Sequence, residues 1–381
     1  MNSLPKRRPT DLSHLGTPRD VNALAMFRRA ILFGAGASAF EVQKVLDRFA
    51  IAITAYADNS AAKQGTAFRD RPVIAPAAIE ALLDGTTAIV IASVYQREIA
   101  EQLKQLGIPA GVVFPFVSPM FAGHFGRGAF IEADDAFDAL GRRLADEASR
   151  DYLAALTAYR WTMDPLALQR NPLLAGFYDY RDAALGPHPG DHIVDVGAYD
   201  GDSAITYLKR LNGRARVSGL EPLPQNLAAL ERTIDAHEFG HAITPVPFGA
   251  GSEPATAELD CEDDAPDARA TLRGKPGARA SIRIETIDRL FAETQVDFIK
   301  IDIEGHDPAA LEGARAILNR DKPGLAIAAY HASEHLWRIP ALIDALCPGY
   351  RIYLGHHPAA AYECELFCVH ESRTKDDRKN V

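Results

Sequence analysis

Two segments of the chain share one pattern of hydrophobic and polar positions. In each, a short apolar run leads into a glycine-rich turn, and apolar residues then recur at helical spacing. The first segment begins at Ala30 and the second at Ile193. This pattern is typical of the opening of a strand–helix–strand unit. The chain is therefore predicted to be an α/β protein with two Rossmann-like, doubly wound parallel sheets.

The first segment predicts a small Rossmann-like domain of the nucleotide-binding type over residues 25–117, after an extension at 1–24. A helix is expected over residues 40–49, where apolar residues fall on one face. Further helical stretches follow Pro76 and Tyr95. Strands are expected at residues 30–33, 51–56, near Val73, at 88–93 and at 112–114.

Residues 118–174 predict a helical connector. Glycines and a proline make its first part loop-like, and charged residues with apolar positions at helical spacing fill residues 134–159. The second domain is expected over residues 175–381 with seven strands, which complete a doubly wound sheet. Those strands are expected at residues 193–196, 217–220, 244–248, 298–302, 325–329, 350–354 and 364–369. The acidic stretch 253–280, rich in glycine and proline, is interpreted as an insertion or loop.

Composition narrows the class of protein. The 381 residues suit two domains, and 47% hydrophobic with 24% charged residues is typical of a globular protein. A net charge of −10 at pH 7 disfavours a nucleic acid as partner. No apolar run is long enough for a membrane span and the N-terminus lacks an apolar signal core, so the protein is predicted to be cytoplasmic. The four cysteines are too few and too scattered along the chain for a disulfide framework, so none is predicted.

The second glycine turn carries carboxylates. Asp195, Asp200 and Asp202 surround Gly197 and Gly201 between a strand and a helix. The glycines allow a ligand to approach the backbone closely, whereas the carboxylates would repel a phosphate. A cationic ligand fits better, and S-adenosylmethionine, with an ammonium and a sulfonium group, is the obvious candidate.

An acidic residue follows the next expected strand. Glu221 lies 24 residues after Gly197, where doubly wound folds place a carboxylate that accepts hydrogen bonds from ribose hydroxyls. The alternative is a solvated strand end. We predict that Glu221 is the ribose ligand, because the glycine turn stands at the right spacing before it.

Charged residues alternate with isoleucines over residues 297–304. Lys300, Asp302 and Glu304 therefore share one face of the expected strand. Burying unpaired charges inside a covered parallel sheet is costly, so these side chains are expected at the carboxyl end of the strand, in the ligand crevice. Asp307 then stands near the N-terminus of a helix expected over 308–318.

Four motifs in this order resemble those of the FkbM-type methyltransferases: residues 195–202, 221–226, 285–288 and 300–307. Residues 329–331 and 353–357 extend the resemblance, which covers about residues 175–370. Asp307 stands where the family usually has glutamate, and Gly355 where arginine is common. The resemblance implies a class I methyltransferase fold with strand order 3-2-1-4-5-7-6 and an S-adenosylmethionine-dependent enzyme that methylates a sugar or polyketide hydroxyl.

The resemblance also implies which residues hold the cofactor. Carried over to this chain, the residues around the methionine part are Asp195, Gly197, Ala198, Tyr199 and Gly201. Glu221 would hold the ribose with Asn226 at its edge, and Gly249 and Ala250 would line the adenine.

Methyl transfer to a hydroxyl needs a group that removes the proton. His331 ends a strand expected beside that of Asp302 and is the first choice for this base; alternatively Asp302 is the base, with His331 as an electrophile or orienting group. Glu304 completes the candidate catalytic group, and Asp302 with Glu304 could also bind Mg²⁺. The alternative is a salt bridge with Lys300, which is favoured as a structural counter-ion over a catalyst. Three further histidines are weaker candidates for contacts with the acceptor: His306, His356 and His357.

The first glycine turn is ambiguous. Gly34 and Gly36 belong to a G-x-G-x-x-A pattern, and Asp58 follows Gly36 by 22 residues. A second nucleotide site, a degenerate fold used for packing or homodimer formation, and a redox NAD site all remain open. The favoured interpretation of the whole chain is a sugar O-methyltransferase; the alternatives are a non-catalytic nucleotide-binding scaffold and an NAD-dependent sugar oxidoreductase.

Overall fold

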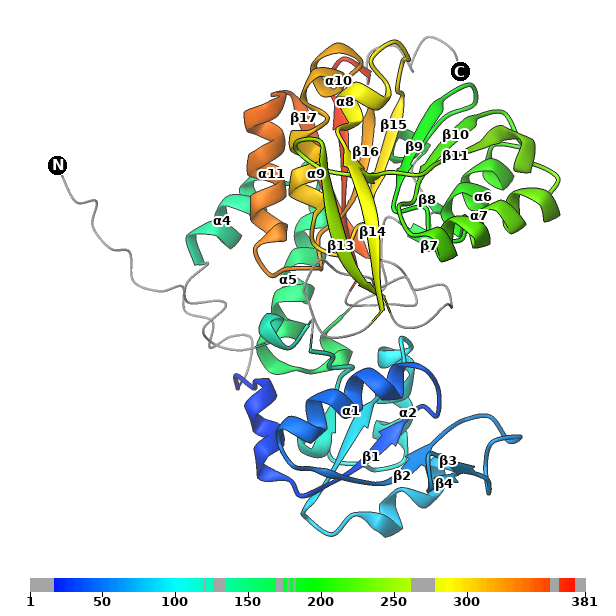
Figure 1. The fold of residues 1–381 in the computed structure, drawn as a ribbon. Helices are drawn as coiled ribbons and strands as arrows, with labels where there is room; N and C mark the ends of the chain where they lie inside the picture. Colours follow the sequence, from blue (N-terminus) through cyan, green and yellow to red (C-terminus); the bar gives the residue numbers. More distant parts are fainter. Residues whose placement is uncertain are drawn as a thin grey trace. The chain divides into compact units, whose positions relative to one another are not determined.

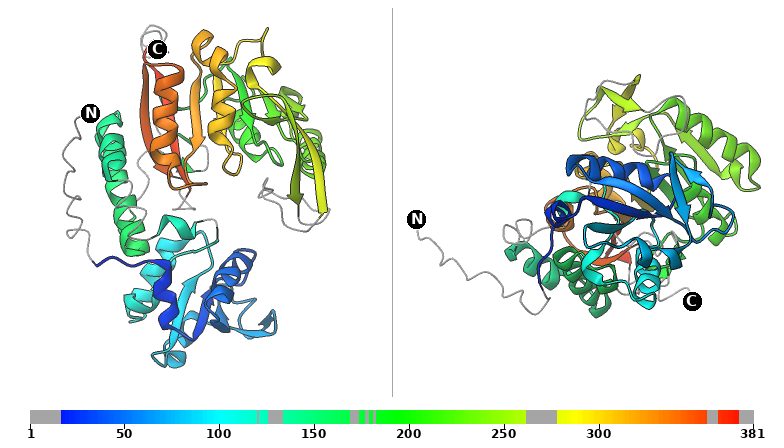
Figure 2. Two further views of the ribbon diagram at one scale, coloured as in Figure 1. Left: turned by 60° about the vertical axis from the view of Figure 1, so that its left-hand side comes forward. Right: turned by 90° about the horizontal axis from the view of Figure 1, so that it is seen from below.

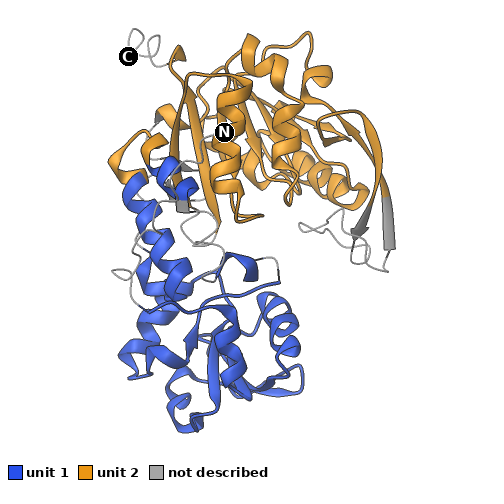
Figure 3. Ribbon diagram, turned by 90° about the vertical axis from the view of Figure 1, so that its left-hand side faces the viewer, with its two compact units in different colours: residues 1–141, 150–170, 359–361 blue, residues 142–149, 171–358, 362–381 orange. Residues whose placement is uncertain are grey.

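A computed structural model describes residues 17–119, 121–125, 134–168, 174–176, 179–180, 183–261, 278–356 and 363–373. The chain divides into two compact units (Figure 3). Of the described residues, unit 1 contains those up to 141 and those from 150 to 168. Unit 2 contains residues 142–149 and everything from 174 onward.

Unit 1 is built on a six-stranded sheet with the order β3-β4-β2-β1-β5-β6 (Figure 1). All neighbouring strands run parallel except β3, which is antiparallel to β4. β5 is buried at every position, as expected of a central parallel strand that is covered on both faces. The strands are β1 (Arg29–Phe33), β2 (Ala52–Ala57), β3 (Ala67–Phe68), β4 (Arg71–Ile74), β5 (Thr87–Ile91) and β6 (Val113–Phe114).

Two α-helices accompany this sheet, α1 (Ser38–Arg48) and α2 (Gln96–Gln105). The helical stretch expected after Pro76 consists only of short 3-10 turns, Pro76–Ala78 and Glu80–Leu82. Other 3-10 turns are Val21–Met26, Ala110–Val112, Ala122–His124 and Pro165–Ala167.

The expected helical connector contains two helices, α4 (Asp134–Arg143) and α5 (Glu147–Thr162). In unit 1, α5 is fixed by the Tyr159 hydroxyl, which donates to Gln96 Oε1 at 2.9 Å. In unit 2, the end of α4 is fixed by Arg143, whose guanidinium donates to the Asp344 carboxylate at 2.6 and 2.9 Å.

Unit 2 is built on a seven-stranded sheet with the order β11-β10-β9-β15-β16-β18-β17. Counted along the chain this is 3-2-1-4-5-7-6, the order that the resemblance implied. Six strands are parallel, and β18 is antiparallel to both of its neighbours. The strands are β9 (His192–Val196), β10 (Arg216–Leu220), β11 (Ile243–Val246), β15 (Phe298–Ile301), β16 (Gly324–Ala328), β17 (Tyr350–His356) and β18 (Cys364–His370).

Helices pack against this sheet: α6 contacts β10, α7 contacts β11, and α11 contacts both β17 and α9 (Figures 1 and 2). The single helix expected over 308–318 is two short helices, α9 and α10. The helices of unit 2 are α6 (Asp202–Arg210), α7 (Pro224–Ala236), α8 (Ile287–Leu290), α9 (Asp307–Glu312), α10 (Arg315–Arg320) and α11 (His335–Leu346). Smaller elements are β7 (Leu174–Gly176), β8 (Asp179–Tyr180) and the 3-10 turns Ala183–Leu185 and Gly240–Ala242.

The stretch interpreted as an insertion or loop contains regular structure. β13 (Ala255–Cys261) pairs antiparallel with β14 (Ala278–Glu285), and β12 (Gly249–Ala250) pairs parallel with β14. Ile282 and Ile284 of β14 pack with Leu223 in a small apolar cluster. The stretch 253–280 thus contains a regular strand, β13, and the first residues of β14, and it forms a hairpin; residues 262–277 lie outside the described residues.

Candidate active site

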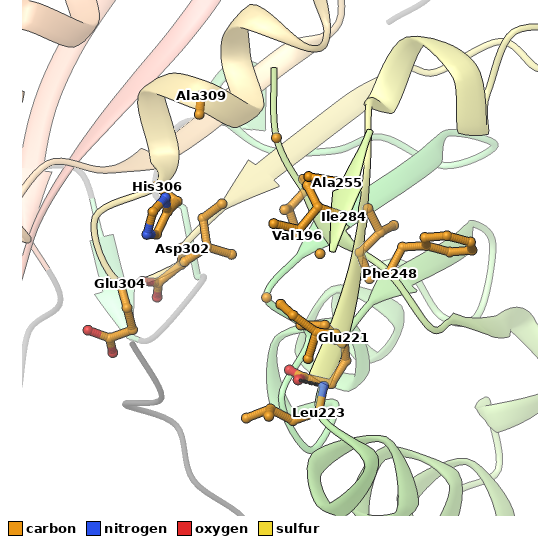
Figure 4. Close-up of a pocket in the computed structure, with 18 of the residues that line it drawn as sticks. Val196, Glu221, Leu223, Phe248, Ala255, Ile284, Asp302, Glu304, His306 and Ala309 are labelled. Carbon is orange, nitrogen blue, oxygen red and sulfur yellow. Dashed lines mark hydrogen bonds between the residues drawn. The ribbon is translucent and has the colours of Figure 1, made fainter. Parts of the chain in front are cut away.

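A cavity of about 270 Å³ lies in unit 2 at the carboxyl ends of β9, β10 and β15 (Figure 4). From β9 the sheet is extended on one side by β10 and β11 and on the other side by β15 and β16. Open α/β sheets bind ligands at the point where the strand order switches sides in this way. Figure 4 shows Asp302, Glu304 and His306 on one side of the cavity, and Glu221, Leu223 and Phe248 on the other. We refer to this cavity as the pocket.

The glycine turn after β9 forms part of the pocket wall through Gly197 and Tyr199. Gly197 has φ of 82°, and a Cβ there would stand 2.1 Å from the carbonyl oxygen of Asp302. Only glycine allows the two loops to approach this closely. Ala198 and Gly201 belong to the same turn but do not line the pocket. Ala198 is fully buried, and Gly201, which precedes α6, packs against Leu230 of α7.

A buried ion pair lies beneath this turn. Asp195 and Lys300 are neighbours across β9 and β15, with Nζ 3.1 Å from Oδ1. Lys300 also donates to the Gly197 carbonyl oxygen at 2.9 Å, and the Ser203 hydroxyl donates to Asp195. Burial alone would lower the pKa of Lys300, but the Asp195 and Asp302 carboxylates raise it above its ordinary value.

Two expectations change with this pair. Lys300 was expected in the crevice with Asp302 and Glu304. That location was wrong, because the Asp195 carboxylate on the neighbouring strand pairs with the Lys300 ammonium group inside the sheet. Asp195 itself is fully buried and does not line the pocket. The buried pair therefore stabilises the glycine turn, because Lys300 binds both the Asp195 carboxylate and the Gly197 carbonyl oxygen.

Glu221 lies in the pocket at the end of β10. Its carboxylate accepts hydrogen bonds from the Tyr199 N–H at 3.1 Å and the Leu223 N–H at 2.9 Å, and the Asn226 side chain also bonds to it. Burial raises the pKa of Glu221 to about 7, although these hydrogen bonds oppose the rise. The carboxylate is thus fixed in orientation and still has acceptor capacity toward the pocket.

The other pocket wall is apolar and includes residues that the sequence did not suggest. Gly249 and Ala250, expected at the adenine, line it together with Phe248 and with Ile282 and Ile284 of the hairpin. The signal that could have identified the hairpin wall is the alternation of isoleucines with polar residues over 281–285.

Asp302 and Glu304 line the pocket, whereas His331 stands behind Asp302. His331 Nε2 is 3.2 Å from Asp302 Oδ1, and its Nδ1 is 2.8 Å from Asp307 Oδ2. The Tyr330 hydroxyl donates to Asp302 at 3.1 Å. Burial lowers the pKa of His331, but the Asp307 and Asp302 carboxylates outweigh it and raise that pKa well above 6.5.

This arrangement bears on the choice of base. Both ring nitrogens of His331 face carboxylates, so neither is turned toward a ligand in the pocket. Asp302 does face the pocket, which favours the alternative in which Asp302 takes the proton and His331 orients it. Among the described residues, Asp302 and Glu304 do not belong to a cluster spaced for a metal ion, so the expected Mg²⁺ has no support.

The remaining histidine candidates are dispersed. His306 lines the pocket from the turn before α9. His356 is buried at the end of β17 and does not line the pocket, and His357 lies outside the described residues.

In unit 1, the acidic residue Asp58 forms a hydrogen bond to the glycine turn itself and an ion pair with a nearby lysine. The Asp58 carboxylate accepts from the Ala35 N–H at 3.0 Å, and Lys63 Nζ stands 2.9 Å from both Asp58 Oδ2 and the Ala35 carbonyl oxygen. Gly34 is required here, since a Cβ would stand 2.4 Å from the Ala92 carbonyl oxygen, whereas Gly36 faces open space. A nucleotide site at this turn stays a prediction.

The strand order, the glycine turn and the pocket at the switch point define a class I methyltransferase fold in unit 2. Residues 195–352 match the family model of the methyltransferase FkbM domain. The chain therefore carries an FkbM-type methyltransferase domain. Residues 26–114 match the model named C2185-like, N-terminal.

A solved methyltransferase structure has the same fold. A methyltransferase FkbM from Methylobacillus flagellatus KT is 24% identical with a TM-score of 0.69, and the match covers 93% of this chain and 94% of that one. Two others share much less. A precorrin-6y C5,15-methyltransferase from Geobacter metallireducens GS-15 is 12% identical (TM-score 0.31, 49% of this chain and 82% of that one). Aeropyrum pernix fibrillarin with S-adenosyl-L-methionine is 15% identical (TM-score 0.32, 51% and 71%).

No curated protein matches the chain. Within the part of the chain that the structure describes, no helix has both the length and the apolar character needed to cross a membrane.

Proposed function

We propose that unit 2 transfers a methyl group from S-adenosylmethionine to a hydroxyl of a carbohydrate, either a nucleotide sugar or a glycan. The observation that carries the proposal is the Glu221 carboxylate, buried in the pocket and aimed by two backbone N–H groups. Such a carboxylate can accept hydrogen bonds from two adjacent ribose hydroxyls. When bound, S-adenosylmethionine supplies an activated methyl group.

The rest of the pocket suits this cofactor. Phe248, Ile282 and Ile284 offer an apolar slot for a planar base next to the backbone of Gly249 and Ala250. On the opposite side, the carboxylates of Asp302 and Glu304 favour a ligand that carries positive charge. The pocket thus offers an apolar wall for a base, a carboxylate for ribose hydroxyls and acidic groups for a cation, which supports the proposed cofactor.

Asp302 is the proposed general base for the acceptor hydroxyl. It lines the pocket, and it is oriented by the Tyr330 hydroxyl and by His331 Nε2. His331 is then a positioning residue, held in turn by Asp307. Glu304 and His306 on the same side provide hydrogen-bonding groups that suit an acceptor with several hydroxyls. The carbohydrate class rests on this polar side together with the family resemblance.

Titration calorimetry with S-adenosylhomocysteine tests the cofactor site. We expect one site per chain in the wild type and an affinity about 100-fold lower in Glu221→Ala, because two charge-assisted hydrogen bonds are lost. Glu231→Ala, on the exposed face of α7, is the matched control. A wild type that does not bind would remove the proposal. Binding without methyl transfer to any sugar nucleotide or glycan would instead indicate a non-catalytic protein.

A further inference from the structure

Three buried side chains converge behind the pocket wall. Asp307 is the first residue of α9, His331 follows β16, and His335 is the first residue of α11. Their exposed fractions are 0%, 8% and 3%. Asp307 Oδ2 is 2.8 Å from His331 Nδ1 and 3.6 Å from His335 Nδ1, and one possible ligand atom from each residue lies within 4.8 Å of the other two. Two imidazole nitrogens and one carboxylate oxygen therefore surround a single point.

Hydrogen bonding alone does not account for this cluster. The distance of 3.6 Å between His335 Nδ1 and Asp307 is too long for a hydrogen bond, and among the described residues this buried nitrogen has no other hydrogen-bond partner. A buried polar atom without a partner is costly, so such atoms are nearly always satisfied by another group. A cation shared by the three donor atoms would satisfy it.

The surroundings of the cluster resemble the outer shell of a metal site. A histidine that binds a metal typically donates its other ring N–H to a carboxylate, and a metal-binding carboxylate is itself hydrogen-bonded. His331 Nε2 faces Asp302 Oδ1 at 3.2 Å, and Asp307 Oδ1 accepts from the Ile303 N–H at 3.1 Å. The carboxylate ligand thus has its own hydrogen bond, and a second carboxylate lies next to the other ring nitrogen of His331.

We propose that Asp307, His331 and His335 bind a divalent transition-metal ion, with Zn²⁺ as the best match. The donor set of two imidazoles and one carboxylate is one that zinc uses, whereas Mg²⁺ and Ca²⁺ prefer oxygen ligands throughout. Donor atoms 2.8 and 3.6 Å apart suit ligands that share one ion at about 2.0–2.2 Å.

The ion has a positioning role. It ties the first residues of α9 and α11 to the segment after β16 and fixes the His331 ring, so that Nε2 stays directed at Asp302 on the pocket wall. Because the three ligands do not line the pocket, the ion does not touch cofactor or acceptor. The site stands on its own geometry and does not depend on the identity of either.

Metal content and cobalt spectroscopy test the site on the full-length protein, purified without a histidine tag. We expect about one zinc ion per chain by plasma mass spectrometry. After removal of the metal with EDTA, titration with Co²⁺ should give visible d–d absorption that saturates at one equivalent and that Zn²⁺ abolishes. His335→Ala and Asp307→Asn should each lower the affinity by about tenfold or more. His188→Ala removes an imidazole 4.0 Å from Asp191 and is the matched control, with unchanged affinity.

Two results would overturn the proposal. If the stripped wild type takes up neither ion at stoichiometric concentration, the three residues form a metal-free relay. If metal binds equally well to His335→Ala and Asp307→Asn, the ion lies elsewhere. Binding of S-adenosylhomocysteine, measured on the same samples, distinguishes failure of the metal site from failure of the proposed function.

Discussion

The raised pKa of Glu221 predicts an opposite pH dependence for stability and for cofactor binding. Burial raises this pKa from an ordinary 4.5 to about 7. Between these two values the folded protein holds a proton at Glu221 that the unfolded chain has released. The free energy of unfolding therefore falls as the pH rises through this window, by at most about 3 kcal/mol.

Glu221→Gln removes this titration while keeping the size of the side chain. Urea unfolding between pH 5 and pH 8 measures the effect, and the informative quantity is the change with pH, because the amide alters the absolute stability at every pH. We expect the wild type to lose free energy of unfolding relative to Glu221→Gln as the pH rises to about 7. The exposed Glu231→Gln should follow the wild type.

The affinity for the cofactor should depend on pH in the opposite direction from stability. The ionised carboxylate is the better acceptor for two ribose hydroxyls, so the affinity of the wild type for S-adenosylhomocysteine should rise with pH and level off above about 7. Below that pH it should fall by up to about tenfold per pH unit, with proton release on binding. Glu221→Gln should show neither effect. Parallel stability curves for wild type and Glu221→Gln would mean that Glu221 is ionised throughout, and would refute the reasoning.

Three further outcomes are expected. Gly197→Ala places a Cβ 2.1 Å from the Asp302 carbonyl oxygen, so calorimetry should show an affinity for S-adenosylhomocysteine that is lower by about tenfold or more. The control is Gly36→Ala, whose Cβ would face open space and which should bind normally. Asp302→Asn should lower the rate of methyl transfer about 10²- to 10⁴-fold with cofactor affinity nearly unchanged; full turnover would exclude Asp302 as the base. Lys300→Met leaves Asp195 buried without its counter-ion and should cost about 3–5 kcal/mol in urea unfolding, with partial recovery when Asp195→Asn is added.

The elements of both sheets were predictable because their signals are local. The first strand of each series, β1 and β9, is a short apolar run next to a glycine turn, and both strands lie in the interior of their sheets. The strand order in unit 2 came from the family resemblance. The hairpin was missed because its clearest signal is the alternation of two isoleucines in β14, and the acidic, glycine-rich composition next to it concealed that alternation.

The site was predictable in part. Glu221 was identified from spacing along the chain, and the structure places it in the pocket. The location of Lys300 was wrong because the cost of burying it was judged without its partner. Asp195 lies about a hundred residues away in sequence, and only the register between β9 and β15 places the two charges side by side. The orientation of His331 was not predictable either, because it depends on contacts with Asp302 and Asp307 on another segment.

These contacts give the two best-defined motifs of unit 2 a joint structural role. Lys300 binds both the Asp195 carboxylate and the Gly197 carbonyl oxygen, and the backbone of Asp302 packs against Gly197 at a distance that excludes any side chain there. The turn after β9 and the loop after β15 therefore fix each other. Since Tyr199 of that turn also donates its N–H to Glu221, the position of the ribose ligand is linked through the turn to that of Asp302. A change at the buried Lys300 should thus alter the pocket without touching a ligand, because the charged residues of these motifs position the pocket as much as they line it.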